Sequence, residues 1–192
     1  MVEHIVSLFL LTFTTMLFFS CNAKNSKPNF DITVKEVVQC EDGGTNELSF
    51  SSTRLNKVSK TTYDYATDYT LAITVDDNLS AVSDVQAWGN GGWRPAFFTF
   101  DTPQLCSGAK HMNPKFFKLF LNGTGKNDCP VPPGTYHMSA HNISLVEVKN
   151  VPMWQYGRYK VLNQLYKEAV LVGCFGAIVE VTPIRRPLKR KH

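Results

Sequence analysis

Residues 129–181 read CPVPPGTYHMSAHNISLVEVKNVPMWQYGRYKVLNQLYKEAVLVGCFGAIVEV. The stretch begins with a cysteine beside prolines and a glycine, which is typical of a turn. An apolar segment follows at residues 151–156, and residues 158–166 and 169–181 are expected to form a final hairpin. Residues 169–174 are apolar on both faces, which is typical of a strand in the middle of a sheet. We therefore expect a β container with an apolar loop at its rim.

The preceding residues predict further strands. Residues 63–75 alternate between apolar and polar side chains, as in a strand with one buried face. The turn at residues 76–78 leads into a second alternating segment that ends near residue 89, and we expect the two to form a hairpin. Residues 93–100 are aromatic and contain a proline, so they are an edge strand or a lining segment. Such hairpins indicate an antiparallel all-β domain rather than a parallel α/β sheet.

One short helix is expected among the strands, and residues 103–106 are expected to form a short turn of helix just before it. Asn113 is a suitable N-cap residue and Pro114 a suitable first helical residue. One face of this helix is apolar and carries Phe116, Phe117, Phe120 and Leu121. Packing of these side chains onto the sheet is the simplest explanation of the pattern.

The N-terminus predicts a secreted protein. Residues 5–19 are almost all apolar, and small residues follow, so we expect a signal peptide of residues 1–23 that is cleaved after Ala23. An uncleaved anchor is the alternative, because Glu3 and His4 stand where basic residues are usual. The apolar run is shorter than the about 20 residues that a spanning helix needs, which favours cleavage.

Secretion gives meaning to the cysteines and to three glycosylation triplets. The cysteines that remain after cleavage are Cys40, Cys106, Cys129 and Cys174. An even number in an oxidising compartment predicts two disulfides, and the residues alone leave all three pairings open. N-linked sugars are expected at Asn78, Asn122 and Asn142.

The excess of positive charge comes from a C-terminal tail, residues 183–192, which follows a single domain of residues 24–182. The whole chain has a formal net charge of +4, and the tail carries Arg185, Arg186, Lys189, Arg190 and Lys191. A solvated terminus is the simplest interpretation, and attraction to anionic lipid head groups is the alternative. The nearly neutral body excludes nucleic acid as an expected partner.

No pattern of residues predicts catalysis. His137 and His141 are four residues apart and would lie on one side of a strand. Zinc takes about three or four ligands, however, and no third candidate has a suitable spacing. The chain has no nucleophile elbow, phosphate-binding loop or HExxH motif. We therefore expect no enzyme activity, metal or cofactor.

Aromatic side chains are abundant, with 13 Phe, 7 Tyr and 3 Trp. They gather at residues 93–100, 116–121 and 151–156, next to turns and loops. Large apolar groups in such places often mark a ligand cavity or a membrane-contacting surface. A β-sandwich whose aromatic residues only fill a core is the plainer alternative.

Several short motifs follow one another in a recognisable order. They are Leu105-Cys106, Cys129-Pro130 followed by Gly134-Thr135-Tyr136, Pro152-Met153-Trp154 followed by Gly157-Arg158-Tyr159, and Gly173-Cys174. In this order and spacing the chain resembles the ML-type lipid-recognition family, well over residues 93–182 and loosely over residues 30–92. It lacks the two further disulfides of the ganglioside-activator branch and is more similar to the insect secreted, chemosensory-B-like branch.

The resemblance implies an antiparallel two-sheet β cup, an immunoglobulin-like sandwich opened at one end to hold acyl chains. It implies disulfides Cys40–Cys174 and Cys106–Cys129, and a rim loop around Trp154 that contacts membranes transiently. The mouth would be edged by Trp154 and residues 93–98. The lipid-binding candidates are Trp93, Phe97, Phe98, Phe116, Phe117, Phe120, Val151, Met153, Trp154, Tyr156 and Tyr159.

The function expected from this resemblance is a secreted protein that binds and transfers lipid. The ligand would be an acyl-chain lipid, including a glycolipid or a hydrophobic semiochemical. The alternatives are an accessory that presents lipid to a hydrolase, or a chemosensory or receptor-accessory protein. The lysosomal lumen is the alternative location.

Overall fold

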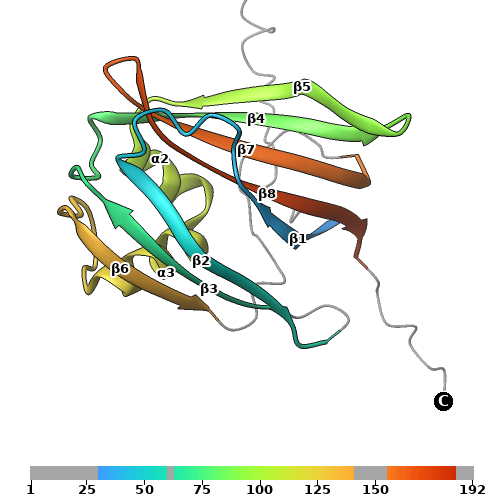
Figure 1. Ribbon diagram of the computed structural model, residues 1–192. Helices are drawn as coiled ribbons and strands as arrows, with labels where there is room; N and C mark the ends of the chain where they lie inside the picture. The colour runs from blue at the N-terminus through green and yellow to red at the C-terminus, as the bar shows by residue number, and fades with distance from the viewer. Residues whose placement is uncertain (1–29, 60–62, 141–154, 185–192) are drawn as a thin grey trace, which may run out of the picture.

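The computed structural model describes residues 30–59, 63–140 and 155–184, and strands dominate it (Figure 1). The order of elements is β1 (Phe30–Val38), β2 (Leu48–Lys57), β3 (Tyr63–Leu71), β4 (Leu79–Gly89), β5 (Gly92–Thr102), α2 (Leu105–Met112), α3 (Pro114–Thr124), β6 (Gly134–Ala140), β7 (Gly157–Lys167) and β8 (Val170–Pro183). The expected signal peptide and most of the basic tail lie outside the described residues. Within the described part of the chain, neither helix has the length and apolar character that crossing a bilayer requires.

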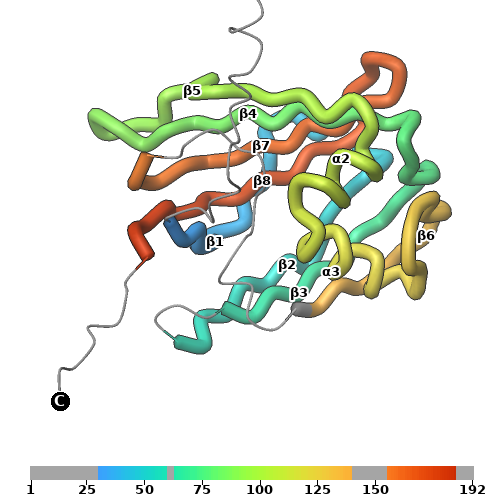
Figure 2. The backbone as a smooth tube through the Cα atoms, turned by 180° about the vertical axis from the view of Figure 1, so that it is seen from behind, coloured from blue at the N-terminus to red at the C-terminus, as the bar shows by residue number. Residues whose placement is uncertain are grey.

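The strands form two layers that share one junction (Figures 1 and 2). One layer has the order β5-β4-β7-β8 with β1 beside β8, and the other has the order β2-β3-β6. Leu48 of β2 and Gly173 of β8 join the layers through a parallel bridge. A Cβ atom at Gly173 would lie 2.6 Å from the Leu48 carbonyl oxygen, so only glycine allows this approach. The expected all-β class is confirmed.

Helices α2 and α3 connect the two layers at one side of the molecule (Figure 2). Helix α2 packs against β4 and β5 in one layer, and α3 packs against β6 in the other. Two sheets that pack directly on each other lie about 10 Å apart, and a helix with its side chains is itself about 10 to 12 Å across. The layers must therefore lie farther apart where the helices insert between them.

The expected hairpin of residues 63–75 with the following strand is wrong. Strand β3 pairs with β2 and β6, whereas β4 pairs with β5 and β7. Residues 72–78 carry the chain from one layer to the other, and Val75 forms a bridge with Val131 on the way. A tight hairpin uses about two turn residues, so this longer connection is suited to a crossover.

The described residues form two helices, where one helix and a short helical turn at residues 103–106 were expected. Helix α2 lacks a local start signal, because the side chain of its N-cap residue, Gln104, makes no capping bond. The carboxylate of Asp77 replaces that cap: it accepts hydrogen bonds from the Ser107 backbone N–H at 2.8 Å and from the Ser107 hydroxyl at 2.6 Å. One backbone donor in the first turn of α2 is thus satisfied by a residue remote in sequence.

Helix α3 begins as expected and ends slightly later. The Asn113 side chain accepts a hydrogen bond from the Phe116 N–H at 3.1 Å, and Pro114 is the first helical residue. Gly125 ends the helix in the left-handed conformation at φ 68°, which is a common helix stop.

Three other expectations are confirmed. Strand β8 is central, because it pairs with β7 on one side and with β1 and β2 on the other. Strand β5 is an edge strand. The disulfides are Cys40–Cys174 and Cys106–Cys129, with Cα–Cα distances of 5.9 and 6.4 Å.

Two groups of buried side chains form the core of the described residues. The cavity cluster contains Leu48, Tyr69, Leu71, Val75, Leu79, Ala81, Cys106, Phe117, Leu121, Val131, Met138, Leu165 and Val172. The packed cluster contains Ile32, Val34, Val85, Ala87, Tyr159, Val179 and Val181. Helices α2 and α3 contribute to the first cluster only.

Candidate functional site

A cavity lies within the cavity cluster, between the layers and the two helices. The centre of a water-sized sphere can occupy about 90 Å³ of it, whereas one water needs only about 10 to 15 Å³ by the same measure. Its lining residues are Leu48, Phe50, Leu71, Val75, Leu105, Cys106, Ala109, Phe116, Phe117, Phe120, Leu165 and Phe175. None of these side chains has a charge or a hydroxyl group. The site can therefore hold an apolar group and offers no side chain for acid–base chemistry.

Aromatic rings from both layers line the cavity. Phe50 of β2 and Phe175 of β8 contact each other, with ring centroids 5.2 Å apart. Tyr69 of β3 lies 6.1 Å from Phe50 and 5.0 Å from Phe120 of α3. Rings of this size span the gap between the layers but do not close it, because the helices hold the layers apart.

The hydroxyl of Tyr69 fixes α3 to the sheet. It donates a hydrogen bond to the Phe120 carbonyl oxygen at 2.8 Å, and the side chain is fully buried. Burial raises the pKa of Tyr69 to about 12, and the neighbouring Tyr136 adds to the rise. The hydroxyl therefore keeps its proton, and the bond persists, at any physiological pH.

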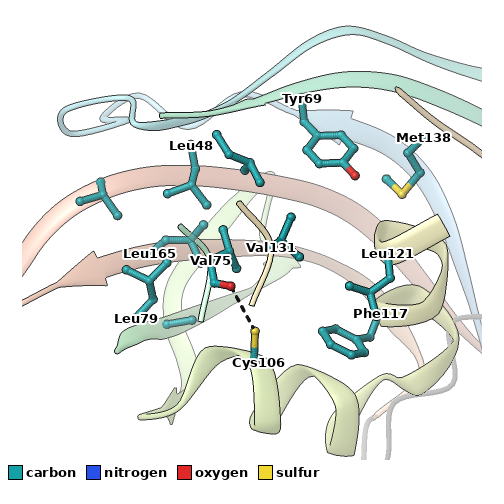
Figure 3. Close-up of a cluster of buried hydrophobic side chains, with 13 residues drawn as sticks. Leu48, Tyr69, Val75, Leu79, Cys106, Phe117, Leu121, Val131, Met138 and Leu165 are labelled. Carbon is teal, nitrogen blue, oxygen red and sulfur yellow. Dashed lines mark hydrogen bonds between the residues drawn. The ribbon is translucent and has the colours of Figure 1, made fainter. Parts of the chain in front are cut away.

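The Cys106–Cys129 disulfide fixes α2 beside the cavity. The Cys106 sulfur lies 3.7 Å from the Val75 carbonyl oxygen (Figure 3). Because a disulfide sulfur has no hydrogen to donate, this is a packing contact. Lys110 of α2 also forms a salt bridge with Asp128, next to the disulfide.

The carboxylate of Asp77 stabilises the start of the same helix. Its hydrogen bonds from Ser107 lower the pKa of Asp77 below the ordinary value of 3.8. The group is therefore ionised throughout the neutral and mildly acidic range. A negative charge near a helix N-terminus also interacts favourably with the helix dipole.

Phe116 connects the cavity with solvent. Its ring belongs to the cavity lining, and 38 % of the residue is exposed. Leu105 and Ala109 of α2, which also line the cavity, are half-buried. The cavity therefore reaches the surface where the start of α3 meets α2.

The structure divides the sequence-predicted lipid-binding residues between two places. Phe116, Phe117 and Phe120 meet at the cavity. Tyr159 is buried in the packed cluster, Phe98 packs against that cluster, and the Phe97 ring lies 5.8 Å from the Tyr159 ring. None of these last three residues lines the cavity.

Of the five other predicted positions, two are described, and neither lines the cavity. Trp93 pairs with Trp88 across β4 and β5, on the sheet face opposite the buried Ala87. The predicted rim segment of residues 93–98 is therefore absent from the cavity lining. Tyr156 is 58 % exposed. The rim residues Val151, Met153 and Trp154 lie outside the described residues.

Sequence reasoning missed most of the cavity lining. The missed residues include Phe50 and Phe175, which face each other across the layers. Phe50 is the one aromatic residue of the Ser- and Thr-rich strand β2, so it was a usable signal of an apolar lining position. Phe175 had no such signal, because β8 is apolar throughout.

The other predicted sites have simple surroundings. Asn78 and Asn122 are exposed, as glycosylation requires, and Asn142 lies outside the described residues. The His137 Nδ1 atom lies 2.7 Å from the Asp68 carboxylate, and this hydrogen bond lowers the pKa of Asp68. Among the described residues, no three His, Cys, Asp or Glu side chains are placed to bind a metal ion.

Comparisons with known proteins gave weak structural matches. No protein-family model and no curated protein sequence matches the chain. Chicken MD-1 complexed with lipid IVa matches with 17% identity over 83% of this chain and 100% of that chain, at a TM-score of 0.34. A Niemann-Pick type C2 protein from the Japanese carpenter ant matches with 13% identity over 75% of this chain and 97% of that chain, at 0.30. Both TM-scores are below 0.5, so neither match carries an argument about function.

Proposed function

We propose that this protein is a secreted, ML-type lipid-binding protein that holds an acyl chain in the cavity beneath α2 and α3. The observation that carries the proposal is the apolar lining, to which both layers and both helices contribute. The order of the sequence motifs and the two disulfide pairs support the ML-type assignment.

The driving force is removal of methylene groups from water. Each buried CH₂ group contributes about 0.8 kcal/mol. Apolar cavities of this kind stay dry, so a chain that enters displaces little ordered water. Selectivity among acyl tails is therefore broad, and the polar head group remains outside, near Phe116.

A binding role also fits the chemistry of the lining. The lining side chains contain no titratable group, and Cys106 is oxidised in a disulfide. The cavity therefore has no nucleophile, acid or base to act on a bound lipid. The proposed activity is reversible uptake and transfer of lipid without covalent change.

Filling the cavity tests the proposal. Ala109 lines the cavity from α2, and Ala109→Phe would place a ring in the space that the acyl chain needs. We expect titration with the fluorescent fatty acid cis-parinaric acid to show saturable binding to the wild-type protein and at least a tenfold loss in the variant.

Lys118→Phe is the matched control, because it adds the same ring at an exposed position of α3. We expect this control to bind like the wild type. Circular dichroism and thermal unfolding establish that each variant is folded, since overpacking costs about 1 to 3 kcal/mol. Wild-type binding by a folded Ala109→Phe protein would exclude the cavity as the site.

Transfer from membranes tests the predicted rim loop separately. We expect Trp154→Ala to slow extraction of lipid from vesicles while equilibrium binding of cis-parinaric acid stays unchanged. Equal transfer rates in the two proteins would remove Trp154 from the mechanism.

A further inference from the structure

Two tryptophans and two cations form an outer patch on the layer that contains β4, β5 and β7. The patch consists of Trp88, Trp93, Arg158 and Lys160. Trp88 and Trp93 are cross-strand partners, with ring centroids 5.0 Å apart in an edge-on arrangement. Lys160 Nζ lies 5.2 Å and the Arg158 guanidinium carbon 6.0 Å from the centre of the Trp93 ring.

The outer patch faces away from both buried clusters. Its strands alternate, and Ala87 and Tyr159, the chain neighbours of the patch residues, are buried on the inner face. The β4–β5 turn, next to Trp88 and Trp93, lies at the end of the layer remote from α2 and α3 (Figure 1). Packing of the cores therefore does not explain the patch.

Trp88 is 45 % exposed, which is unfavourable for a large indole in water. Arg158 is also exposed, and Lys160 is half-buried beside the Trp93 ring. Indole rings favour the boundary between water and lipid, where the ring meets acyl chains and its N–H meets polar groups. The two cations lie close to the Trp93 ring on the same face of the layer.

Two carboxylates on the neighbouring strands, those of Glu180 and Asp84, are engaged by other groups. Glu180 is the cross-strand partner of Arg158, and its carboxylate lies 2.8 Å from Lys35 Nζ. Asp84 accepts hydrogen bonds from the Ala96 N–H at 3.0 Å and the Gln86 amide at 2.8 Å. Among the described residues, no salt bridge engages Arg158 or Lys160. The patch therefore carries positive charge for an external anion.

We propose that the outer patch docks the protein on anionic lipid bilayers. Four side chains are far fewer than the roughly 20 to 30 residues per side in a stable protein interface, which argues against an acidic protein partner. A bilayer needs no such area, because inserted indoles and cations near the charged surface act additively. The site is separate from the cavity and does not require that the cavity hold a lipid.

Tryptophan fluorescence tests the docking directly. The chain has three tryptophans, so Trp154→Phe leaves only Trp88 and Trp93 to report. With vesicles of brominated phosphatidylcholine and phosphatidylserine, we expect the emission of this variant to shift to the blue and to be quenched. We expect both effects to disappear near 1 M salt, where the Debye length falls to about 3 Å.

Removal of the two charges measures their contribution. Each cation near an anionic surface contributes about 1 kcal/mol, so Arg158→Gln with Lys160→Gln should weaken partitioning about thirtyfold. The matched control, Lys115→Gln with Lys118→Gln, removes the same charge from the exposed surface of α3 and should change partitioning less than about twofold. Arg158→Lys with Lys160→Arg keeps the charge and should bind like the wild type.

Three results would overturn the docking proposal. They are an equal loss in the α3 control, vesicle binding without quenching of Trp88 and Trp93, and no binding to phosphatidylserine vesicles at all. The quenching experiment leaves the patch intact, so it decides the matter even if the neutralised variant does not fold. Binding of cis-parinaric acid should survive neutralisation of the patch, which separates failure of this proposal from failure of the cavity.

Discussion

The cavity cluster draws its members from both layers and both helices, whereas every buried member of the packed cluster comes from β1, β4, β7 or β8 of one layer. Strands β4 and β7 contribute to both, through Leu79 and Leu165 in the cavity cluster and through Val85 and Tyr159 in the packed cluster. None of the packed-cluster residues lines the cavity.

The helices account for the difference. In the cavity cluster, α2 and α3 stand between β4 and β5 on one side and β6 on the other, and a helix is too thick to let sheet edges close. The packed cluster has no helical member, and its β-branched side chains from β1, β4 and β8 pack against one another. We therefore infer that the inserted helices, together with the strands they separate, shape the candidate binding site.

The largest expected effect comes from the Cys40–Cys174 disulfide, whose cysteines do not line the cavity. Cys40→Ala with Cys174→Ala opens a link over a sequence separation of 134, which should lower the free energy of unfolding by about 5 kcal/mol. Because this effect acts mainly on the unfolded chain, the folded variant should still bind cis-parinaric acid. Denaturant unfolding and fluorescence titration measure the two quantities.

The cavity disulfide should behave differently. Its sequence separation is 23, so Cys106→Ala with Cys129→Ala should cost about 3 kcal/mol. We expect acyl binding to weaken as well, because Cys106 holds α2 against the lining. Equal ligand affinity in both disulfide variants would contradict the role assigned to the helices.

A matched pair of core truncations compares packing in the two clusters. Ile32 of the packed cluster is 4 % exposed and Leu165 of the cavity cluster is 3 % exposed. Ile32→Ala should cost about 4 kcal/mol and Leu165→Ala about 2 kcal/mol, because atoms that already face a cavity have fewer contacts to lose. Urea unfolding measures both values, and a larger loss for Leu165→Ala would mean that the cavity is filled by protein.

The Tyr69 hydroxyl should give the smallest effect. Tyr69→Phe removes one hydrogen bond to α3 and should lower stability by about 1 kcal/mol. In the wild type, stability should stay level up to pH 10 and fall between pH 10 and the folded-state pKa of about 12, since the unfolded tyrosine loses its proton first. Unfolding curves at several alkaline pH values should show a shallower decline for Tyr69→Phe.

Local patterns predicted much of the fold. The alternation in residues 63–75 placed the buried side of β3 correctly, since Tyr69 and Leu71 are buried. Asn113 and Pro114 predicted the start of α3 because their capping role is local in sequence. The doubly apolar β8 predicted a central strand for the same kind of reason.

Features that depend on remote residues were not predictable in this way. Helix α2 is capped by Asp77 from another part of the chain, so local residues predicted only a short helical turn at residues 103–106. The crossover between β3 and β4 depends on which layer offers each strand a partner, and alternation does not report that. For the site, the helix phenylalanines stood out by periodicity, whereas Phe50, Leu165 and Phe175 meet only through tertiary packing.

Nuclear Overhauser contacts from a bound acyl chain test the central claim most directly. With protonated palmitate and a methyl-labelled protein, the account predicts contacts from acyl protons to the methyl groups of Leu48, Leu71 and Leu165, which line the cavity. It predicts none to Val85 or Val179 of the packed cluster. Contacts to the packed-cluster methyl groups, or a saturated complex without contacts to the cavity leucines, would contradict it.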